Sequence, residues 1–466
     1  MTEQKKIVIV GAGPAGLTAA WELMKDENCP YEVTVLEMSD AVGGMAKSVI
    51  HNGDIMDVGG HRFFSKEKMV LEWWKNIFDR KEAMQSLLLR HRKVSIYYRK
   101  QFFDYPVTLN LKNISQLGIM NAYHIVISYL KYCIYPRKEC SLEDFYVNRF
   151  GKKLYAMFFE KYTEKLCGAH PRLISSQWGK ERVRGLSVGK IVKKQLDRKG
   201  WQTSESLLSP SLFYYPKHGP GELWELVAED IVKKGGVLHL NCRVVNWKQR
   251  EDGSIESVMV KCASGVEEIR GDIFVSSMPL RELIQGMNMV PEAIRLTAEK
   301  LPYRSFVSIG LWVNCLKIVV PEQWIYVHED AVKVCRIQFC QNWSPYLVQE
   351  QEKQFIALEY FCEEGDEFWS LPEEECMQIA VKEAIELGIL DRNVQVLDWH
   401  RERIAKAYPG YHSGYEGIEI IRDYISKVEN LYCMGRNGLH QYWNMDRCMI
   451  SAWDTVEQIK KKCPSS

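Results

Sequence analysis

The 466-residue sequence lacks a Cys-x-x-Cys pair, an excess of charge of either sign, and an internal repeat. Its 14 cysteines do not have the spacing of a zinc ribbon or a thioredoxin-like motif, so we expect reduced cysteines, a cytoplasmic protein and no metal site. The 61 lysines and arginines balance 60 acids, and the net charge of +1 gives no global attraction for nucleic acid. An anionic ligand would therefore need a local cluster of cations.

Long hydrophobic runs are also missing. Only four strongly apolar residues follow Lys5-Lys6 before the first glycine, which is too short for a signal peptide. The best candidate for a membrane segment, residues 117–135, contains Asn121, His124 and Lys131. We therefore expect a buried helix there and no stable membrane span, with peripheral attachment as an open alternative. Nothing in the sequence indicates an oligomeric state.

The chain is long enough for two or three interlocked domains and has the composition of a globular protein, with 46% hydrophobic and 26% charged residues. Aromatic residues reach 11%. Such side chains suit either the wall of a ring-binding pocket or a bulky core, and composition alone does not choose between the two.

A glycine motif opens the chain. The apolar run 7–10 leads into Gly11-Ala12-Gly13-Pro14-Ala15-Gly16 and then a helical stretch. In this setting the first glycine permits a tight turn, the second lets the backbone approach a pyrophosphate, and the third lets the helix pack on the strand. A second apolar strand ends at Glu37, about 20 residues later, where a ribose-binding carboxylate belongs. The motif predicts dinucleotide binding.

The segments that follow identify the dinucleotide through a resemblance. Val42-Gly43-Gly44-Met45-Ala46 is similar to the GG segment of the large FAD family that includes amine oxidases, protoporphyrinogen oxidase and UDP-galactopyranose mutase. This resemblance implies FAD and a glutathione-reductase-like fold. The next motif, residues 57–61, is similar to the DVGGH segment of eukaryotic-type UDP-galactopyranose mutases, whose histidine lies beside the flavin ring. It implies a flavin-facing His61, for which a general-base role stays open.

Four further segments resemble the same mutases, and with the N-terminal motif the likeness spans nearly the whole chain. They are residues 103–106, 215–224, 324–345 and 435–446. In that family two arginines clamp the nucleotide diphosphate and several tyrosines bind the same phosphates, as guanidinium and phenol donors can. With His61, the matching positions form the predicted catalytic set of Arg182, Arg336, Tyr326, Tyr408 and Tyr442.

The sequence departs from the mutase pattern at two positions, and its terminal segment from Tyr442 to Asp446 is about two residues shorter. Trp343 stands where the family has a third diphosphate tyrosine, and Pro210 stands where it has an asparagine that touches the nucleotide. The predicted FAD-binding residues come from the glycine motif and from the resemblance together. They are Gly11, Gly13, Ala15, Gly16, Glu37, Met38, Gly43, Gly44, Met45, Gly60, His61, Val244, Gly435, Arg436, Asn444 and Met445.

The remaining patterns predict an α/β protein. We expect strands at 237–247, 254–262, 272–276, 306–313, 323–327, 334–339, 355–361 and 431–434, and helices over 145–165 and 446–460. The resemblance arranges them as a discontinuous, glutathione-reductase-like FAD-binding Rossmann domain (1–65, 205–290 and 415–466). An inserted mixed β-sheet substrate domain (66–109 and 291–414) and a helical subdomain (110–204) complete the expected architecture.

The resemblance implies an enzyme, a FAD-dependent sugar-nucleotide mutase of cell-surface polysaccharide biosynthesis. It would interconvert the pyranose and furanose rings of a UDP-sugar through a flavin N5–sugar adduct. The alternative is an amine oxidase or protoporphyrinogen oxidase-like oxidoreductase or desaturase, which would consume an electron acceptor, whereas a mutase shows no net redox. A flavin-binding protein without catalysis is a third hypothesis, and no feature of the sequence favours it. Only one GxGxxG motif is present, so the route of flavin reduction stays open.

Overall fold

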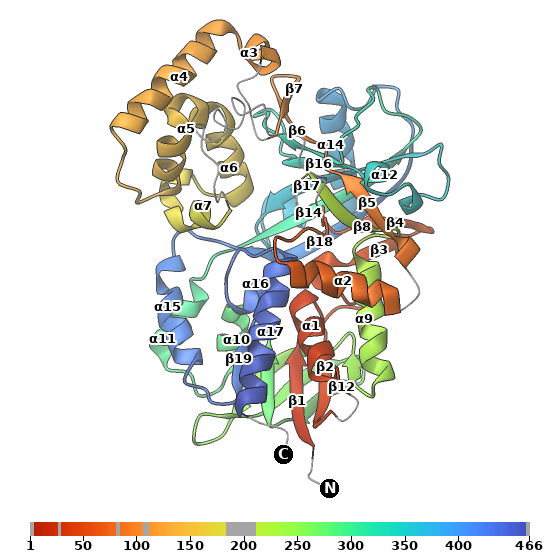
Figure 1. The fold of residues 1–466 in the computed structure, drawn as a ribbon, viewed down its shortest axis with the longest axis vertical. Helices are drawn as coiled ribbons and strands as arrows, with labels where there is room; N and C mark the ends of the chain where they lie inside the picture. The colour runs from red at the N-terminus through yellow and green to blue at the C-terminus, as the bar shows by residue number, and fades with distance from the viewer. Residues whose placement is uncertain (1–3, 27–28, 81–83, 106–110, 183–210, 463–466) are drawn as a thin grey trace.

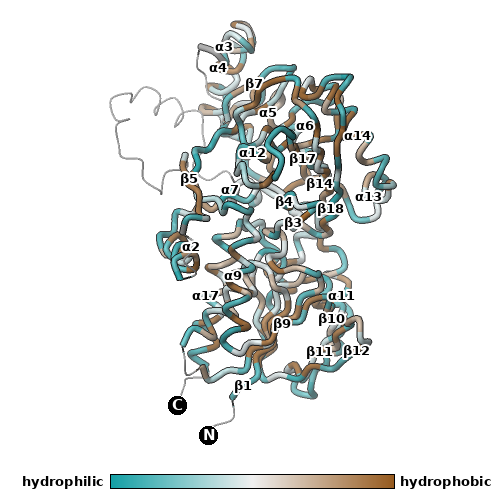
Figure 2. The backbone as a smooth tube through the Cα atoms, turned by 90° about the vertical axis from the view of Figure 1, so that its right-hand side faces the viewer, coloured by the Kyte–Doolittle hydropathy of each residue, from teal (hydrophilic) through white to brown (hydrophobic). Residues whose placement is uncertain are grey.

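The computed structural model describes residues 4–26, 29–80, 84–105, 111–182 and 211–462. One end of the molecule holds both chain termini and a parallel sheet, and the other end holds a large mixed sheet flanked by a group of helices (Figure 1). Hydrophobic segments follow the strands of both regions (Figure 2), as expected for sheets that are covered on both faces. The predicted α/β class is therefore confirmed.

The parallel sheet draws its strands from the start, the middle and the end of the chain. Its five strands lie in the order β19-β13-β1-β2-β9. Helices α1, α9 and α17 pack around it, and the apolar faces of strands and helices share one core. The bounds of these elements are β1 (Lys5–Val10), β2 (Tyr31–Leu36), β9 (Val237–His239), β13 (Ile273–Ser276), β19 (Leu431–Cys433), α1 (Pro14–Leu23), α9 (Gly221–Lys233) and α17 (Met445–Lys462).

A small antiparallel sheet corrects one prediction. Residues 237–247 were expected as one strand, but they split between β9 of the parallel sheet and β10 (Arg243–Gln249), which pairs with β11 (Ile255–Cys262). The break falls at Asn241, whose backbone adopts a positive φ of 55°. Asparagine tolerates this left-handed conformation better than most residues, so the strand ends there. β12 (Gly265–Arg270) completes the small sheet.

The mixed sheet has seven strands in the order β18-β14-β17-β16-β15-β6-β7, all antiparallel except the β15/β6 pair. The four predicted strands between 306 and 361 are confirmed as β14, β15, β16 and β17. One apolar face packs on α14 (Glu373–Glu386). The strand bounds are β6 (Val94–Tyr98), β7 (Gln101–Asp104), β14 (Tyr303–Val313), β15 (Trp324–Val327), β16 (Arg336–Phe339), β17 (Gln354–Cys362) and β18 (Val396–Pro409).

Two pairs of short strands and several helices connect these sheets. β3 pairs with β4, and β5 pairs with β8. Their bounds are β3 (Ser48–His51), β4 (Asp54–Asp57), β5 (Leu87–His91) and β8 (Leu212–Pro216). The connecting helices are α2 (Lys68–Arg80), α10 (Leu280–Gly286), α11 (Glu292–Glu299), α12 (Cys340–Trp343), α13 (Glu367–Ser370), α15 (Ile418–Ile425) and α16 (Gly435–Gly438).

The helical group corrects two further expectations. The helix expected over 145–165 is two helices that meet at Phe159, and the first is kinked at Gly151 (φ 76°). The helix expected at 117–135 is present as α4, but it is not buried: only Ala122 and Ile125 on it are. The helices of this group are α3 (Leu111–Leu117), α4 (Ile119–Ile134), α5 (Leu142–Phe158), α6 (Glu160–Cys167) and α7 (Ser176–Arg182).

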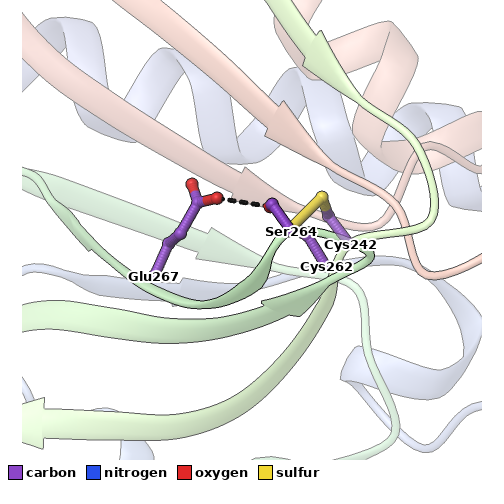
Figure 3. The surroundings of a disulfide bond; sticks show 4 residues. All are labelled: Cys242, Cys262, Ser264 and Glu267. Atoms are coloured by element: carbon purple, nitrogen blue, oxygen red, sulfur yellow. Dashed lines mark hydrogen bonds between the residues drawn. A yellow bond between two sulfur atoms is a disulfide. The ribbon is translucent and has the colours of Figure 1, made fainter.

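The expectation of uniformly reduced cysteines is wrong at one site. Cys242 and Cys262 form a disulfide at the open end of the β10/β11 pair (Figure 3), with their Cα atoms 4.5 Å apart. The antiparallel register pairs Arg243 with Lys261, so the two cysteines come to face each other just beyond that pair. Their separation of 20 residues in the sequence conceals this proximity.

Candidate flavin and substrate site

The glycine motif forms the turn between β1 and α1 at the carboxyl edge of the parallel sheet. Gly11 has a φ of 102°, and a Cβ there would lie 2.2 Å from Ser277 Oγ. A Cβ on Gly16 would lie 1.8 Å from the Gly11 carbonyl oxygen, so α1 approaches the turn as closely as only glycine allows. Gly13 differs from both, because a Cβ there would meet only Gly44 Cα, at 3.8 Å. Its missing side chain therefore leaves space rather than relieving a clash.

The start of α1 carries no charge of its own that would oppose an anion. The helix has no side-chain cap and no acid in its first turn. Its first-turn amides and its positive dipole end therefore suit a bound phosphate. The late glycine motif converges on the same point, since a Cβ on Gly435 would lie 2.9 Å from Ala15 Cβ. Gly435 has a φ of 75° and begins α16 there.

Glu37 lies at the end of β2 and is almost fully buried. Its Oε2 accepts the amide of Ala12 at 2.7 Å, and its Oε1 accepts the amide and hydroxyl of Ser39. These bonds fix the carboxylate at the edge of the glycine turn. Each carboxylate oxygen can accept more than one hydrogen bond, so ribose hydroxyls can still bind.

His61 is half-buried close to two arginines and is neutral at physiological pH. Burial first, and then the charges of Arg436 and Arg336, lower the pKa of the imidazole to about 3. Nδ1 lies 3.0 Å from the carbonyl oxygen of Gly59. A carbonyl only accepts, so Nδ1 carries the proton and Nε2 is left as an acceptor. With so low a pKa the ring suits hydrogen bonding better than proton transfer near neutral pH.

Arg336 on β16 and Tyr326 on β15 are direct partners across the antiparallel ladder. Arg336 also bonds Glu359 on β17, with Nε at 2.8 Å from Oε2 and Nη2 on the same oxygen. Burial works to lower the pKa of the guanidinium, but Glu359, Tyr408 and Tyr326 together outweigh it and hold that pKa well above its ordinary value. A permanently charged guanidinium therefore lies within electrostatic reach of two of the predicted tyrosines.

Tyr408 and Tyr442 stack on each other with ring centroids 4.9 Å apart. The guanidinium of Arg436 lies over both rings, 5.0 Å from that of Tyr408 and 5.6 Å from that of Tyr442. Its Nε donates to the Trp443 carbonyl and its Nη1 to the Ala407 carbonyl. Arg436 therefore joins α16, close to the glycine turn, to the tyrosine pair.

A small pocket of about 20 Å³ opens between this tyrosine pair and the helical group. Trp178 on α7 forms one wall and packs edge-on against Tyr442 at 6.0 Å. Arg304 and His412 contribute polar atoms to the lining. The helical group therefore closes one side of the predicted substrate site.

The sequence matches a known protein family over nearly its whole length. Residues 14–460 match the family described as flavin containing amine oxidoreductase. The chain belongs to this family. Its members bind FAD, which is the cofactor expected from the glycine motifs.

Curated relatives of this flavin family are similar over part of their length. A coproporphyrinogen III oxidase of Staphylococcus aureus is 22% identical over 255 residues, which are 52% of this chain and 54% of that protein. A protoporphyrinogen oxidase 2 of Arabidopsis thaliana is 24% identical over 227 residues, 44% of this chain and 42% of that protein. The chain thus spans about half the length of these relatives.

The fold is shared over nearly the whole chain with a solved structure of reduced UDP-galactopyranose mutase. The TM-score is 0.81, with 20% identity, and the match covers 99% of this chain and 97% of the mutase. The architecture is therefore that of FAD-dependent oxidoreductases and mutases, as predicted. An identity this low shows the fold alone.

The residues of this flavin family member fit FAD. The space beside Gly13, the uncapped start of α1 and the buried Glu37 are what a pyrophosphate and a ribose require. Val244 lies in β10, two residues after the disulfide-bonded Cys242, whose amide donates to the Glu37 carbonyl. Met45 contacts Arg436 through its sulfur at 3.3 Å.

Other predicted positions vary in how closely the structure ties them to the site. A Cβ on Gly44 would lie 3.2 Å from Gly13 Cα, so Gly43 and Gly44 line the glycine turn. Met38 is 63% exposed. Asn444 is exposed and precedes α17, while Met445 begins that helix and packs on the core of the parallel sheet. Gly60 packs against Trp343 and Gln338. Arg182 ends α7, and its side chain lies outside the described residues, as does Pro210.

Trp343 lies beside Gly60, but its indole N–H is engaged within the protein. The indole is buried, donates to the Gln323 carbonyl at 3.0 Å and stacks on Trp324 at 5.1 Å. It packs in a core cluster with Trp324, Phe213 and Tyr215. The phenol donor that the mutase pattern has at this position is therefore not replaced by the indole.

Sequence reasoning missed Glu359 and Arg62. Glu359 is fully buried within an apolar strand, and a single acid inside such a strand was an available signal. Arg62 directly follows His61. Burial and the charge of Arg92 lower the pKa of its guanidinium to about 10, while Tyr326 and Tyr105 act in the opposite direction. These two arginines and two tyrosines therefore lie close enough to influence one another.

Proposed function

We propose that this protein is a FAD-dependent mutase of a nucleotide-sugar, a UDP-sugar by resemblance, that serves cell-surface polysaccharide assembly. The observation that carries the proposal is the environment of Arg336. Tyr326 faces it across the ladder, Tyr408 acts on its pKa, and a Cβ on Gly59 would lie 3.8 Å from its Nη2 beside the His61 ring. Residues from three strands and one loop thus gather around Arg336, which supports a diphosphate site next to the flavin.

The proposed role of Arg336 is to hold the diphosphate. Glu359 engages Nε and Nη2 and keeps the side chain in place. Within the described part of the chain no residue accepts a hydrogen bond from Nη1, which leaves this edge for phosphate oxygens, and a guanidinium can meet these in pairs. Glu359 offsets part of the positive charge of Arg336. The hydroxyls of Tyr326 and Tyr408 add neutral hydrogen-bond donors for the diphosphate beside it.

Bound FAD supplies a nucleophilic or hydride-transferring ring. Around it, neutral His61 offers Nε2 as an acceptor and so orients a sugar hydroxyl without adding a charge. Arg436 and the stacked Tyr408 and Tyr442 form a rigid wall. Trp178 and the helical group limit the entry of water from one side.

Oxidation of a porphyrinogen is the second candidate, and the names of the curated relatives favour it. In this case the same cationic site would hold the carboxylates of a tetrapyrrole. The two functions differ in their electron balance, since the oxidase consumes an acceptor with each turnover and the mutase does not.

The test uses the purified yellow holoprotein. UDP and UDP-galactose are titrated into its oxidised and chemically reduced forms while flavin absorbance is followed, and products are separated by chromatography. We expect a spectral response and ring interconversion only after reduction, without oxygen uptake. Arg336→Lys should weaken UDP binding about tenfold and retain FAD, whereas Arg270→Lys, on an exposed strand, should change neither.

Two results would reject the mutase. One is an absence of any UDP response in the reduced holoprotein. The other is oxygen-dependent oxidation of coproporphyrinogen that is impaired by Arg336→Lys, which would establish the oxidase instead.

A further inference from the structure

Helix α4 presents an unusual outer surface. It lies at the end of the molecule that is farthest from both chain termini (Figures 1 and 2). Its inner side packs on α5 through Ala122 and Ile125. Its outer side carries large apolar residues with exposed fractions between 42% and 79%. They include Ile119, Tyr123, Val126, Ile127, Leu130 and Ile134, which we call the α4 stripe.

The spacing makes the α4 stripe continuous. At 3.6 residues per turn these positions fall within an arc of about 120° on one side of the helix. Exposed apolar residues are common singly, but a continuous row of them marks a surface that contacts something other than water. Ala122 and Ile125, which pack α4 on α5, lie outside this arc, so the fold itself does not need the stripe.

The charges around the α4 stripe indicate what it contacts. Residues 105–138 contain four basic residues and no acid, in a chain whose net charge is only +1. Arg137 is compensated by Glu143 and Asp144. Lys131 and Lys138 are exposed, and Lys131 borders the stripe on the helix surface. An apolar row beside cations complements an anionic lipid surface, which offers acyl chains below phosphate and carboxylate groups.

The aromatic residues agree with this occupant. Tyr123 lies on the α4 stripe and Tyr135 follows the end of the helix, and they are 59% and 73% exposed. Tyrosine favours the boundary between water and lipid, where its ring is apolar and its hydroxyl is hydrated. None of the helices in the described part of the chain has the length and apolar character needed to cross a bilayer. Contact along the surface is the geometry that remains for α4.

We propose that the α4 stripe docks the protein on an anionic phospholipid bilayer, with α4 lying in the plane of the membrane. The apolar side chains enter the boundary of the acyl region, and Lys131 and Lys138 contact lipid phosphates. This proposal does not depend on whether the enzyme is a mutase or an oxidase.

The test is co-sedimentation of the full-length holoprotein with vesicles of phosphatidylcholine containing about 30% phosphatidylserine, and with phosphatidylcholine alone. We expect binding to the mixed vesicles that weakens with salt. The double variant Ile127→Glu and Leu130→Glu should lower the partition coefficient about tenfold or more. Lys131→Glu with Lys138→Glu should lower it on anionic vesicles only.

The matched control is Ile50→Glu with Val319→Glu, which removes two apolar side chains that are 75% and 97% exposed away from α4 and should leave binding unchanged. FAD content and thermal unfolding of each variant report whether it folds. Two results would overturn the proposal. One is wild-type protein that stays in the supernatant with anionic vesicles. The other is a dimer that forms without lipid and dissociates in the Ile127→Glu, Leu130→Glu variant, which would assign the stripe to a second copy of this chain.

Discussion

Arg336 and Glu359 are direct partners across the β16/β17 ladder, and the guanidinium bonds one carboxylate oxygen through two of its nitrogens. Glu359 is fully buried and also accepts from Gln338 Nε2 at 2.7 Å. A buried ion pair of this kind fixes the direction of the guanidinium. Removing one partner alone would leave the other as an uncompensated charge.

Glu359→Gln should therefore destabilise the protein by about 3 kcal/mol, because it leaves the charge of Arg336 largely buried and uncompensated. The measurement is the midpoint of thermal unfolding, monitored through the increase in FAD fluorescence when the cofactor is released. The double variant Arg336→Met with Glu359→Leu should regain most of the loss, since it removes both charges. A Glu359→Gln protein as stable as the wild type would show that the pair contributes nothing.

The glycine motif was predictable because its geometry is local. Gly16 and Glu37 contact Gly11 and Ala12 within one β-α-β unit, so their spacing along the chain carries the information. Four strands of the mixed sheet, β14 to β17, were predictable because apolar residues dominate them. β18 was not predicted, since charged residues interrupt its apolar pattern.

Features that depend on register between distant strands were not predictable. The Arg336–Glu359 pair joins two strands whose order in the sheet the sequence does not state. Cys242 and Cys262 meet because of one antiparallel alignment. The exposure of α4 was not predicted for another reason. An apolar composition indicates burial, but it does not show how many faces of the helix are packed against the rest of the protein.

The two glycines of the first motif should respond differently to alanine. Gly16→Ala places a Cβ against the Gly11 carbonyl oxygen and should prevent stable folding of the parallel sheet. Gly13→Ala adds a Cβ that the protein tolerates, yet it fills space expected to hold the pyrophosphate. That variant should fold and bind FAD at least about tenfold more weakly. Absorbance of the bound flavin and circular dichroism separate the outcomes, and Gly13→Ala with full FAD content would contradict the assignment.

The charge state of His61 should not change between pH 5 and pH 8, because burial and two arginines lower the pKa of its imidazole to about 3. Its resonances in a histidine-labelled sample should stay constant over that range, while the urea-unfolded protein titrates near pH 6.5. Arg436→Gln removes one of the two positive charges and should move the pKa upward. Since folding disfavours the charged imidazole, acidification from about pH 6.5 toward pH 3 should cost stability through this group. A resonance of His61 that titrates near pH 6.5 in the native protein would show that the ring is solvated.

Asp57 offers a stability test with the opposite pH dependence. Its carboxyl is buried and bonded by Tyr215 Oη and by Ser48 Oγ, and burial raises its pKa to about 7 despite these donors. A folded pKa above the unfolded value of 3.8 means that the protonated acid contributes stability below about pH 4, and that this contribution is lost as the pH rises through about 7. Asp57→Asn cannot ionise, so its thermal midpoint relative to wild type should be higher at pH 8 than at pH 5. Equal differences at the two pH values would mean that Asp57 is already ionised in the folded protein at pH 5.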